Sequence, residues 1–182
     1  MADSNITKNA LAASLKNLMR EKPFEKISVS DICDACGMNR KSFYYHFKDK
    51  YDLVNWIFLV SFMGKMEIGT YETGWDAVKD ICHKFYEDRE FYRAALKIEG
   101  QNSFHDYVIE SIRPVVYLYI NDMIKDNELK DFFVTFYCDA FLSAITRWLS
   151  EGMQMNDEEF VGKLKIVSVG LAKIVIRDEE KS

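Results

Sequence analysis

The chain has 182 residues, of which 48% are apolar, so it can bury a core in one or two domains and is not a disordered chain. Its net charge of −5 at pH 7 argues against a protein that coats DNA with its whole surface. No apolar run has the form of a signal peptide or reaches transmembrane length, so we expect a cytoplasmic protein without a membrane segment.

The charge is divided unevenly along the chain. Residues 1–50 contain nine Lys or Arg and six Asp or Glu residues and carry +3, whereas residues 51–182 contain fifteen and twenty-three and carry −8. A basic first part on an acidic remainder is typical of a protein that touches DNA with one end. Ordinary fluctuation of composition is the alternative explanation for this asymmetry taken alone.

Few residues interrupt helices, because the chain has two prolines and eight glycines. Apolar residues recur at helical spacing, which predicts an all-α protein of about nine helices. We expect residues 1–4 to be irregular. A first helix, capped by Asn5 or Thr7, should run to about Glu21, because Pro23 follows.

Residues 28–47 have the layout of a helix-turn-helix. Ser28 is placed to cap a short helix and to form a capping box with Asp31. Gly37 follows at the position where a left-handed residue ends a helix, and Asn39 is placed to cap the second helix.

The second helix of this motif divides its side chains between two surfaces. Phe43 and Phe47 lie four residues apart and are expected to face the core. The remaining side chains supply the cationic and hydroxyl groups that bind phosphates and base edges in a DNA groove. They are Arg40, Lys41, Ser42, Tyr44, Tyr45 and His46.

The segment GMNRKSFYYHFKDKYDL, residues 37–53, resembles the signature of the TetR/AcrR family of bacterial transcriptional regulators. The family pattern runs from a glycine and a small apolar residue through polar residues to Phe-Tyr-x-His-Phe, and then to a lysine followed by a leucine. The resemblance implies a helix-turn-helix DNA-binding domain at residues 5–65. It also implies a helical effector-binding and dimerisation domain at residues 66–182.

The resemblance further implies roles for single residues. Tyr44 and His46 match positions that contact the DNA backbone, and Lys41 and Tyr45 match positions that face bases. Lys50 matches a lysine that grips a phosphate. A packing role is the alternative for Tyr44 and His46. The candidate DNA-binding residues are Ser28, Asn39, Arg40, Lys41, Ser42, Tyr44, Tyr45, His46 and Lys50.

Cys33 and Cys36 form a C-x-x-C pair, a spacing that occurs in zinc and redox sites. No second pair follows at zinc-ribbon spacing, and the family has small residues at both positions. We therefore expect two small packing residues, no metal ion and no cofactor.

Beyond the motif, a connecting helix is expected from Lys50 to about Ile68, with a boundary loop at residues 69–74. Further helices are expected at about 75–87, 89–98, 104–125, 129–149 and 156–176. Pro114 lies inside one of them. It should either bend that helix and open a cavity, or divide it into two shorter helices.

Aromatic residues in the C-terminal part are candidates for a ligand pocket. At helical spacing such residues more often form a core, and the family architecture is what favours a pocket for a small apolar or aromatic ligand. The candidates are Phe85, Tyr92, Tyr107, Tyr117, Phe133, Phe136, Tyr137 and Phe141.

The last two predicted helices are apolar over more than one face, so each needs a partner surface. A second copy of the chain, paired in a four-helix bundle, is the simplest partner. Candidate residues for this dimer interface are Ala140, Ala144, Ile145, Trp148, Leu164, Val167, Leu171 and Ile174.

No phosphate-binding loop, dinucleotide fingerprint, HExxH or GxSxG motif occurs, so we do not expect an enzyme. The sequence predicts a homodimeric regulator that binds double-stranded operator DNA. Repression controlled by a small-molecule effector is the primary hypothesis. The alternative is a regulator or activator controlled by a coregulator protein, as in the family branch that includes the activator of the dihydroxyacetone-kinase operon.

Overall fold

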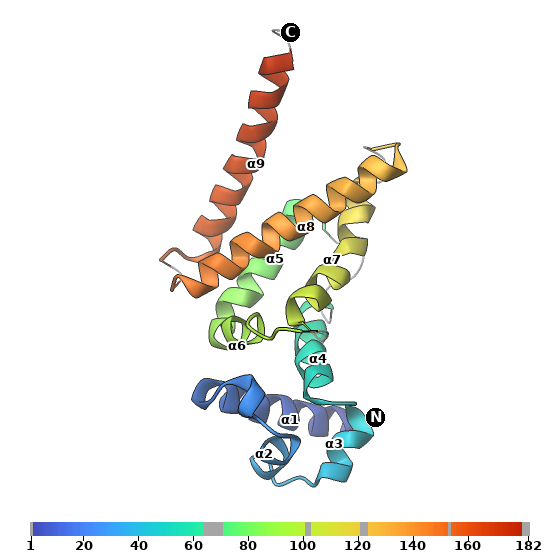
Figure 1. Ribbon diagram of the computed structural model, residues 1–182, viewed down its shortest axis with the longest axis vertical. Helices are drawn as coiled ribbons and strands as arrows, with labels where there is room; N and C mark the ends of the chain where they lie inside the picture. Colours follow the sequence, from blue (N-terminus) through green and yellow to red (C-terminus); the bar gives the residue numbers. More distant parts are fainter. Residues whose placement is uncertain (1, 64–70, 101–102, 121–123, 153, 180–182) are drawn as a thin grey trace.

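The computed structural model describes residues 2–63, 71–100, 103–120, 124–152 and 154–179. Within these ranges it contains nine α-helices, one short 3-10 helix and no strand (Figure 1), which confirms the all-α prediction. The α-helices are α1 Ala2–Glu21, α2 Val29–Asp34, α3 Arg40–His46, α4 Lys50–Met63, α5 Gly74–Glu87, α6 Arg89–Ala95, α7 Phe104–Ile120, α8 Asn127–Ser150 and α9 Asp157–Glu179; the 3-10 helix is Phe24–Lys26.

Helices α1, α2 and α3 pack together as a head at one end of the molecule (Figure 1). Leu11, Leu15, Ile32 and Phe43 form its fully buried centre. The prediction that residues 1–4 are irregular was wrong for residues 2–4, because α1 already begins at Ala2. No Gly or Pro precedes Leu11, so each added residue extends the helix by one hydrogen bond.

The turns of the helix-turn-helix follow the sequence signals. The Ser28 hydroxyl accepts the Asp31 N–H at 3.1 Å, and the Asp31 carboxylate accepts the Ser28 N–H at 2.7 Å. Gly37 has a φ of +67°, the left-handed conformation that glycine adopts at low cost. The side-chain amide oxygen of Asn39 accepts the Ser42 N–H at 2.9 Å and caps α3.

Helix α4 connects the head to the remaining helices (Figure 1). It is buried on several sides, as predicted for a connector, and Phe58 lies at its centre. The Phe58 ring centroid lies 6.2 Å from that of Phe85, 5.7 Å from that of Phe104 and 5.3 Å from that of Phe62. The predicted continuation of this helix to Ile68 lies outside the described residues.

Helices α5, α7 and α8 form the body, with α8 lying across α7 and α9 packed on α5 (Figure 1). Helix α7 continues through Pro114, so of the two alternatives the division into two shorter helices is excluded. At the turn into α9, the Trp148 ring stacks on Phe160 at 4.3 Å, and its indole N–H donates to the Met155 carbonyl at 3.0 Å.

Candidate DNA-binding surface and ligand cavity

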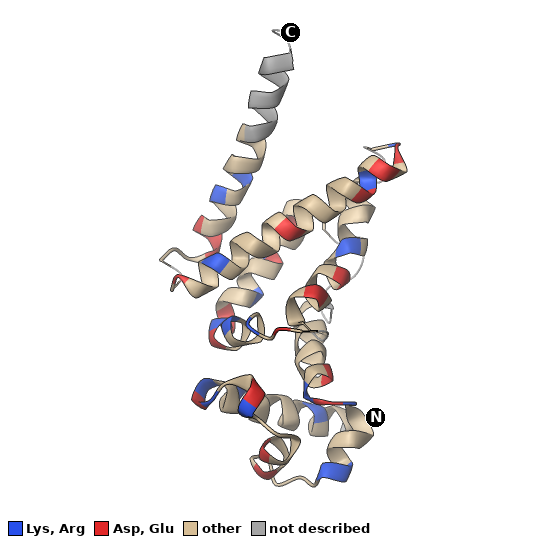
Figure 2. Ribbon diagram, viewed as in Figure 1, with Lys and Arg blue, Asp and Glu red and all other residues tan. Residues whose placement is uncertain are grey.

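Helix α3 presents one face to the core and the other to solvent. Phe43 is fully buried and Phe47, which directly follows the helix, is 3% exposed. On the opposite side Arg40, Lys41 and Tyr44 are exposed, and Tyr45 is 83% exposed. Figure 2 shows Lys and Arg residues on α3, whereas Asp and Glu residues recur along α7 and α8. These four candidate DNA-binding side chains therefore share an outer surface at the end of the molecule.

Two ring contacts hold the side chains of this surface. The Arg40 guanidinium lies 5.8 Å from the Tyr44 ring centroid, a cation–π distance. The Tyr45 ring meets His46 edge to face, with 4.8 Å between centroids. His46 is half-buried, so its ring both supports Tyr45 and keeps part of its surface toward solvent.

Ser28, Asn39 and Ser42 have partners inside the protein. Ser28 and Asn39 are the caps of α2 and α3, and the Ser42 hydroxyl donates to the Asn39 side chain at 3.2 Å. The Ser28 N–H and hydroxyl, together with Lys22 at 3.1 Å, lower the pKa of Asp31 from 3.8 to about 2. These side chains therefore shape the two helix N-termini that border the surface.

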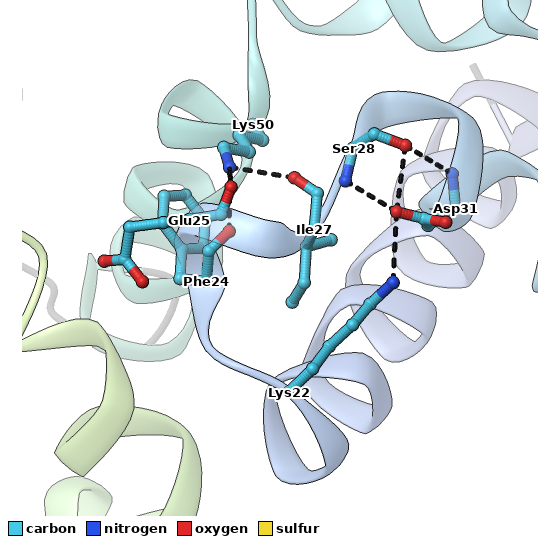
Figure 3. Close-up of polar contacts among 7 residues, drawn as sticks. All are labelled: Lys22, Phe24, Glu25, Ile27, Ser28, Asp31 and Lys50. Atoms are coloured by element: carbon cyan, nitrogen blue, oxygen red, sulfur yellow. Dashed lines mark hydrogen bonds and ion pairs between the residues drawn. The ribbon is translucent and has the colours of Figure 1, made fainter.

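Lys50 has protein partners that the sequence did not indicate. Its ammonium nitrogen lies 2.7 Å from the Phe24 carbonyl oxygen, 2.8 Å from that of Ile27 and 3.3 Å from that of Glu25 (Figure 3). Partial burial lowers the pKa of this lysine. The family resemblance implies that this side chain binds a phosphate, whereas in the structure its ammonium group binds three backbone carbonyls.

The body contains a cavity of about 350 Å³ between α5, α7 and α8. Four of the predicted pocket residues line it: Phe85, Phe133, Tyr137 and Phe141. On α8 the last three are four residues apart and therefore share one face. Residues that the sequence interpretation missed include Trp75, Val78, Ile112, Val115, Val116 and Tyr119.

The other four predicted pocket residues do not line this cavity. Tyr92 is buried with its ring 4.4 Å from that of Phe85, and Tyr107 packs toward Phe58 at 6.3 Å. The Tyr117 hydroxyl donates to Asp131, and Phe136 is 56% exposed. Phe136 lies off the inward face because it precedes Tyr137 by one residue, a rotation of about 100° around the helix.

The lining of the cavity is almost entirely apolar and carries no Asp, Glu, Lys, Arg or His side chain among the described residues. The Tyr119 hydroxyl donates to the Tyr71 carbonyl at 3.2 Å, and burial raises the pKa of the Cys138 thiol to about 11, so that thiol stays neutral. A charged group in this space would lose its hydration without gaining a counter-ion.

The predicted dimer residues fall into separate groups. Ala140 and Val167 are exposed, and Ala144 and Leu164 are half-buried. Ile145 and Trp148 are each 5% exposed, so both pack inside the single chain, and their assignment to a dimer interface was wrong. The side chains of Leu171 and Ile174 lie outside the described residues.

Large apolar side chains nevertheless remain exposed on α8 and α9. On α8 they are Leu129, Phe132 and Phe136, which fall on the same stripe as Ala140. The Phe132 and Phe136 rings stack at 6.5 Å. On α9 Ile166, Val167 and Val169 are exposed. An exposed stripe of this kind is typical of an interaction surface.

The head and the body are joined by side chains of α1 and α6. Lys16 pairs with Asp88, which directly precedes α6, and its ammonium lies 5.2 Å from the Phe91 ring centroid. One turn further along α1, Arg20 pairs with Glu90 at 3.0 Å. These contacts supplement α4 as a connection between the two parts.

Cys33 is buried and Cys36 is half-buried, and the Cys36 thiol donates to the Ile32 carbonyl at 3.4 Å. Burial raises the pKa of Cys33, as in a packing residue. Among the described residues, no three His, Cys, Asp or Glu side chains lie together as metal ligands would. In the same part of the chain, no helix has the length and apolar character needed to cross a membrane.

Known proteins resemble both parts of the chain. Residues 11–57 match the tetR family of bacterial regulatory proteins, and residues 73–170 match the C-terminal region of transcriptional regulators. The HTH-type dhaKLM operon transcriptional activator DhaS of Lactococcus lactis subsp. lactis (strain IL1403) is 24% identical over 151 residues, which are 81% of this chain and 81% of that protein.

Two solved structures share the fold. The dihydroxyacetone kinase operon activator DhaS has a TM-score of 0.69 at 22% identity, covering 94% of this chain and 97% of that chain. NalD, the secondary repressor of the MexAB-OprM multidrug efflux pump in Pseudomonas aeruginosa, has a TM-score of 0.61 at 15% identity, covering 88% and 93%.

The match at residues 73–170 spans more than half of the chain, and the match at residues 11–57 contains the helix-turn-helix. Together they confirm the family resemblance and the prediction of a DNA-binding transcriptional regulator. The chain belongs to the TetR family of bacterial regulatory proteins.

Proposed function

We propose that this regulator is a homodimeric repressor whose affinity for operator DNA is controlled by an uncharged, ring-containing small molecule. The observation that carries the proposal is the apolar cavity of about 350 Å³ in the body. In this proposal residues 5–65 form the DNA-binding domain, and residues 66–182 form the effector-binding and dimerisation domain. We also propose a cytoplasmic location and no enzymatic activity.

Operator contacts come from the outer surface of α3. Lys41 and Tyr45 are exposed and face the base edges, while Arg40, Ser42, Tyr44 and His46 lie nearer the DNA backbone. A cationic side chain and an aromatic ring at these positions suit guanine edges and thymine methyl groups in a major groove. The helix caps Ser28 and Asn39 orient the helices and bring backbone N–H groups toward phosphates.

Dimerisation uses the exposed stripe of α8, with Phe132, Phe136 and Ala140, and the exposed part of α9. TetR regulators bind DNA as homodimers, and a two-fold pair would place two copies of α3 in successive major grooves about 34 Å apart. Burial of both stripes removes apolar area from water on each chain, which is the driving force of such association.

The ligand is neutral because the cavity offers no charged partner. Its shape follows from the walls, because α8 contributes three aromatic rings and the α7 wall is mostly aliphatic. An apolar cavity of about 150 Å³ holds one benzene ring, so this one suits about two fused or linked rings. Tyr137 is one lining residue whose hydroxyl could orient such a molecule.

Cavity and head are connected through α4. Phe62, near the end of α4, lines the cavity, and Lys50 begins the same helix at the head. A ligand that displaces Phe62 would tilt α4 and alter the separation of the two heads. It shifts DNA binding only to the extent that it binds one separation more tightly than the other.

The test first measures fluorescence anisotropy of the pure protein with DNA from upstream of its own gene and its neighbours, across salt concentrations. One fragment should bind tightly, with two protomers per site and a steep salt slope. Thermal unfolding is then followed with 2-naphthol, which is uncharged at pH 7, and with the anion 2-naphthoate. We expect 2-naphthol to raise Tm and 2-naphthoate to leave it unchanged.

Matched variants separate cavity binding from surface binding. Val116→Trp places an indole in the cavity and should abolish the response to 2-naphthol, whereas Leu118→Trp places it on the exposed side of the same helix and should not. Equal responses of both variants would rule out the cavity as the site, without affecting the DNA-binding result.

Activation controlled by a protein partner is the second candidate. The similarity to the activator DhaS favours activation, and the exposed Phe132 and Phe136 favour a protein partner. A dimer that leaves these rings accessible, together with no stabilisation by neutral ring compounds, would support it. In that case we expect the protein to activate a reporter gene, and only when a second protein is present, instead of repressing it.

A further inference from the structure

The ammonium group of Lys50 is saturated by the protein. Carbonyl oxygens of Phe24, Glu25 and Ile27 lie within 3.3 Å of it, and an ammonium has three N–H donors. The same nitrogen lies 4.3 Å from the Phe24 ring centroid, and that ring meets Tyr51 edge to face at 5.0 Å. No donor of this lysine is left for a phosphate while these contacts persist.

The contact with Ile27 has a specific consequence for the helix-turn-helix. The peptide bond between Ile27 and Ser28 is held from both sides: its carbonyl accepts from Lys50, and its N–H donates to Asp31 at 2.7 Å (Figure 3). Lys22 holds the same Asp31 carboxylate at 3.1 Å. The orientation of this peptide bond sets the N-terminus of α2.

We propose that Lys50 is a positioning residue that ties the first turn of α4 to the entrance of the helix-turn-helix, and that it does not contact a phosphate. Lys50 lies in the first turn of α4, whereas its three acceptors belong to the segment between α1 and α2. Any rotation of α4 therefore moves the N-terminal cap of α2. Helix α2 in turn packs directly on α3.

Three variants test this role. Lys50→Met removes the charge and keeps the apolar stem, and Lys50→Arg keeps the charge. The planar fork of arginine cannot aim three donors at carbonyls that converge on one nitrogen. Lys48→Met is the matched control. It removes the same charge at a position two residues before Lys50, and the Lys48 side chain is exposed.

The first readout is hydrogen–deuterium exchange of residues 24–31 in the free protein, with Tm alongside. Both Lys50 variants should exchange about tenfold faster in this segment and lose about 5 °C in Tm, whereas Lys48→Met should match the parent protein. If Lys50→Met does not fold, Lys50→Arg decides by the same exchange measurement. Exchange and Tm that stay unchanged in the Lys50 variants overturn the proposal.

The second readout is the salt dependence of binding to a random 30-base-pair duplex and to the upstream fragment that the protein selects. Both Lys50 variants should bind the selected fragment about tenfold more weakly, with the same salt slope on the random duplex. A slope that falls by about 0.9 in Lys50→Met and returns in Lys50→Arg identifies a phosphate contact and overturns the proposal.

Discussion

Phe132→Ala is expected to weaken dimerisation strongly while leaving the fold of the single chain intact. Phe132 is 69% exposed on the outer stripe of α8. A phenylalanine buries roughly 200 Å² at most, so covering the exposed part removes about 140 Å² per chain. At about 25 cal/mol per Å² this corresponds to about 3.5 kcal/mol, and two-fold symmetry doubles it.

Alanine retains one carbon and the area figure is an upper bound, so we expect a loss of about 3–6 kcal/mol per dimer. That loss raises the dimer dissociation constant by a factor of about 10² to 10⁴. Sedimentation equilibrium over a range of protein concentrations measures the constant directly. Tm extrapolated to the monomer should change little, because the Phe132 ring lies on the surface and stacks there on Phe136.

Ile6→Ala is the matched control, since Ile6 is 64% exposed on α1 of the head, away from the stripe. It removes a similar exposed apolar group and should leave the dissociation constant unchanged. A Phe132→Ala protein that dimerises as tightly as the parent protein would refute the placement of the interface on this stripe of α8.

Further changes test other features. Lys41→Ala should weaken binding to the selected upstream fragment about tenfold or more in anisotropy, with unchanged circular dichroism and Tm, because Lys41 is exposed. Ser28→Ala should cost about 1 kcal/mol, or roughly 2–4 °C in Tm, through loss of the cap of α2. The folded state lowers the pKa of Asp31 from 3.8 to about 2, so the stabilisation by its carboxylate is present above pH 3.8 and is lost as the pH falls through 2. The urea midpoint of unfolding should therefore decline less between pH 5 and pH 2 in Asp31→Asn than in the parent protein. Trp148→Ala should lower the free energy of unfolding by about 3–5 kcal/mol in urea titrations, since the indole stacks on Phe160 inside the chain.

Local signals in the sequence were sufficient for the helix-turn-helix. A capping box at Ser28, a left-handed residue at Gly37 and a cap at Asn39 each act within a few residues, so each could be recognised without knowledge of the fold. The exposed face of α3 follows from the same local reasoning, because Phe43 and Phe47 fix which side faces the core.

Only half of the residues predicted for the pocket line the cavity. Phe133, Tyr137 and Phe141 share a face of α8, but which face of α8 meets α7 depends on how the two helices cross. The opposite wall, with Ile112, Val115 and Val116, has a regular helical spacing that could have been noticed. The spacing identifies a stripe, but it does not distinguish a packed stripe from one that borders a void.

The sequence by itself determined the helix boundaries around the motif, the all-α class and the family, because caps, glycines and the 3.6-residue period are local properties. Only the tertiary structure decided the partners of long-range side chains. It placed Trp148 and Ile145 inside the chain, left Phe132 and Phe136 outside, and gave Lys50 three carbonyls far from it in sequence. These outcomes depend on how helices cross and on which polar groups the folded backbone leaves unpaired, and neither quantity is a property of a short segment.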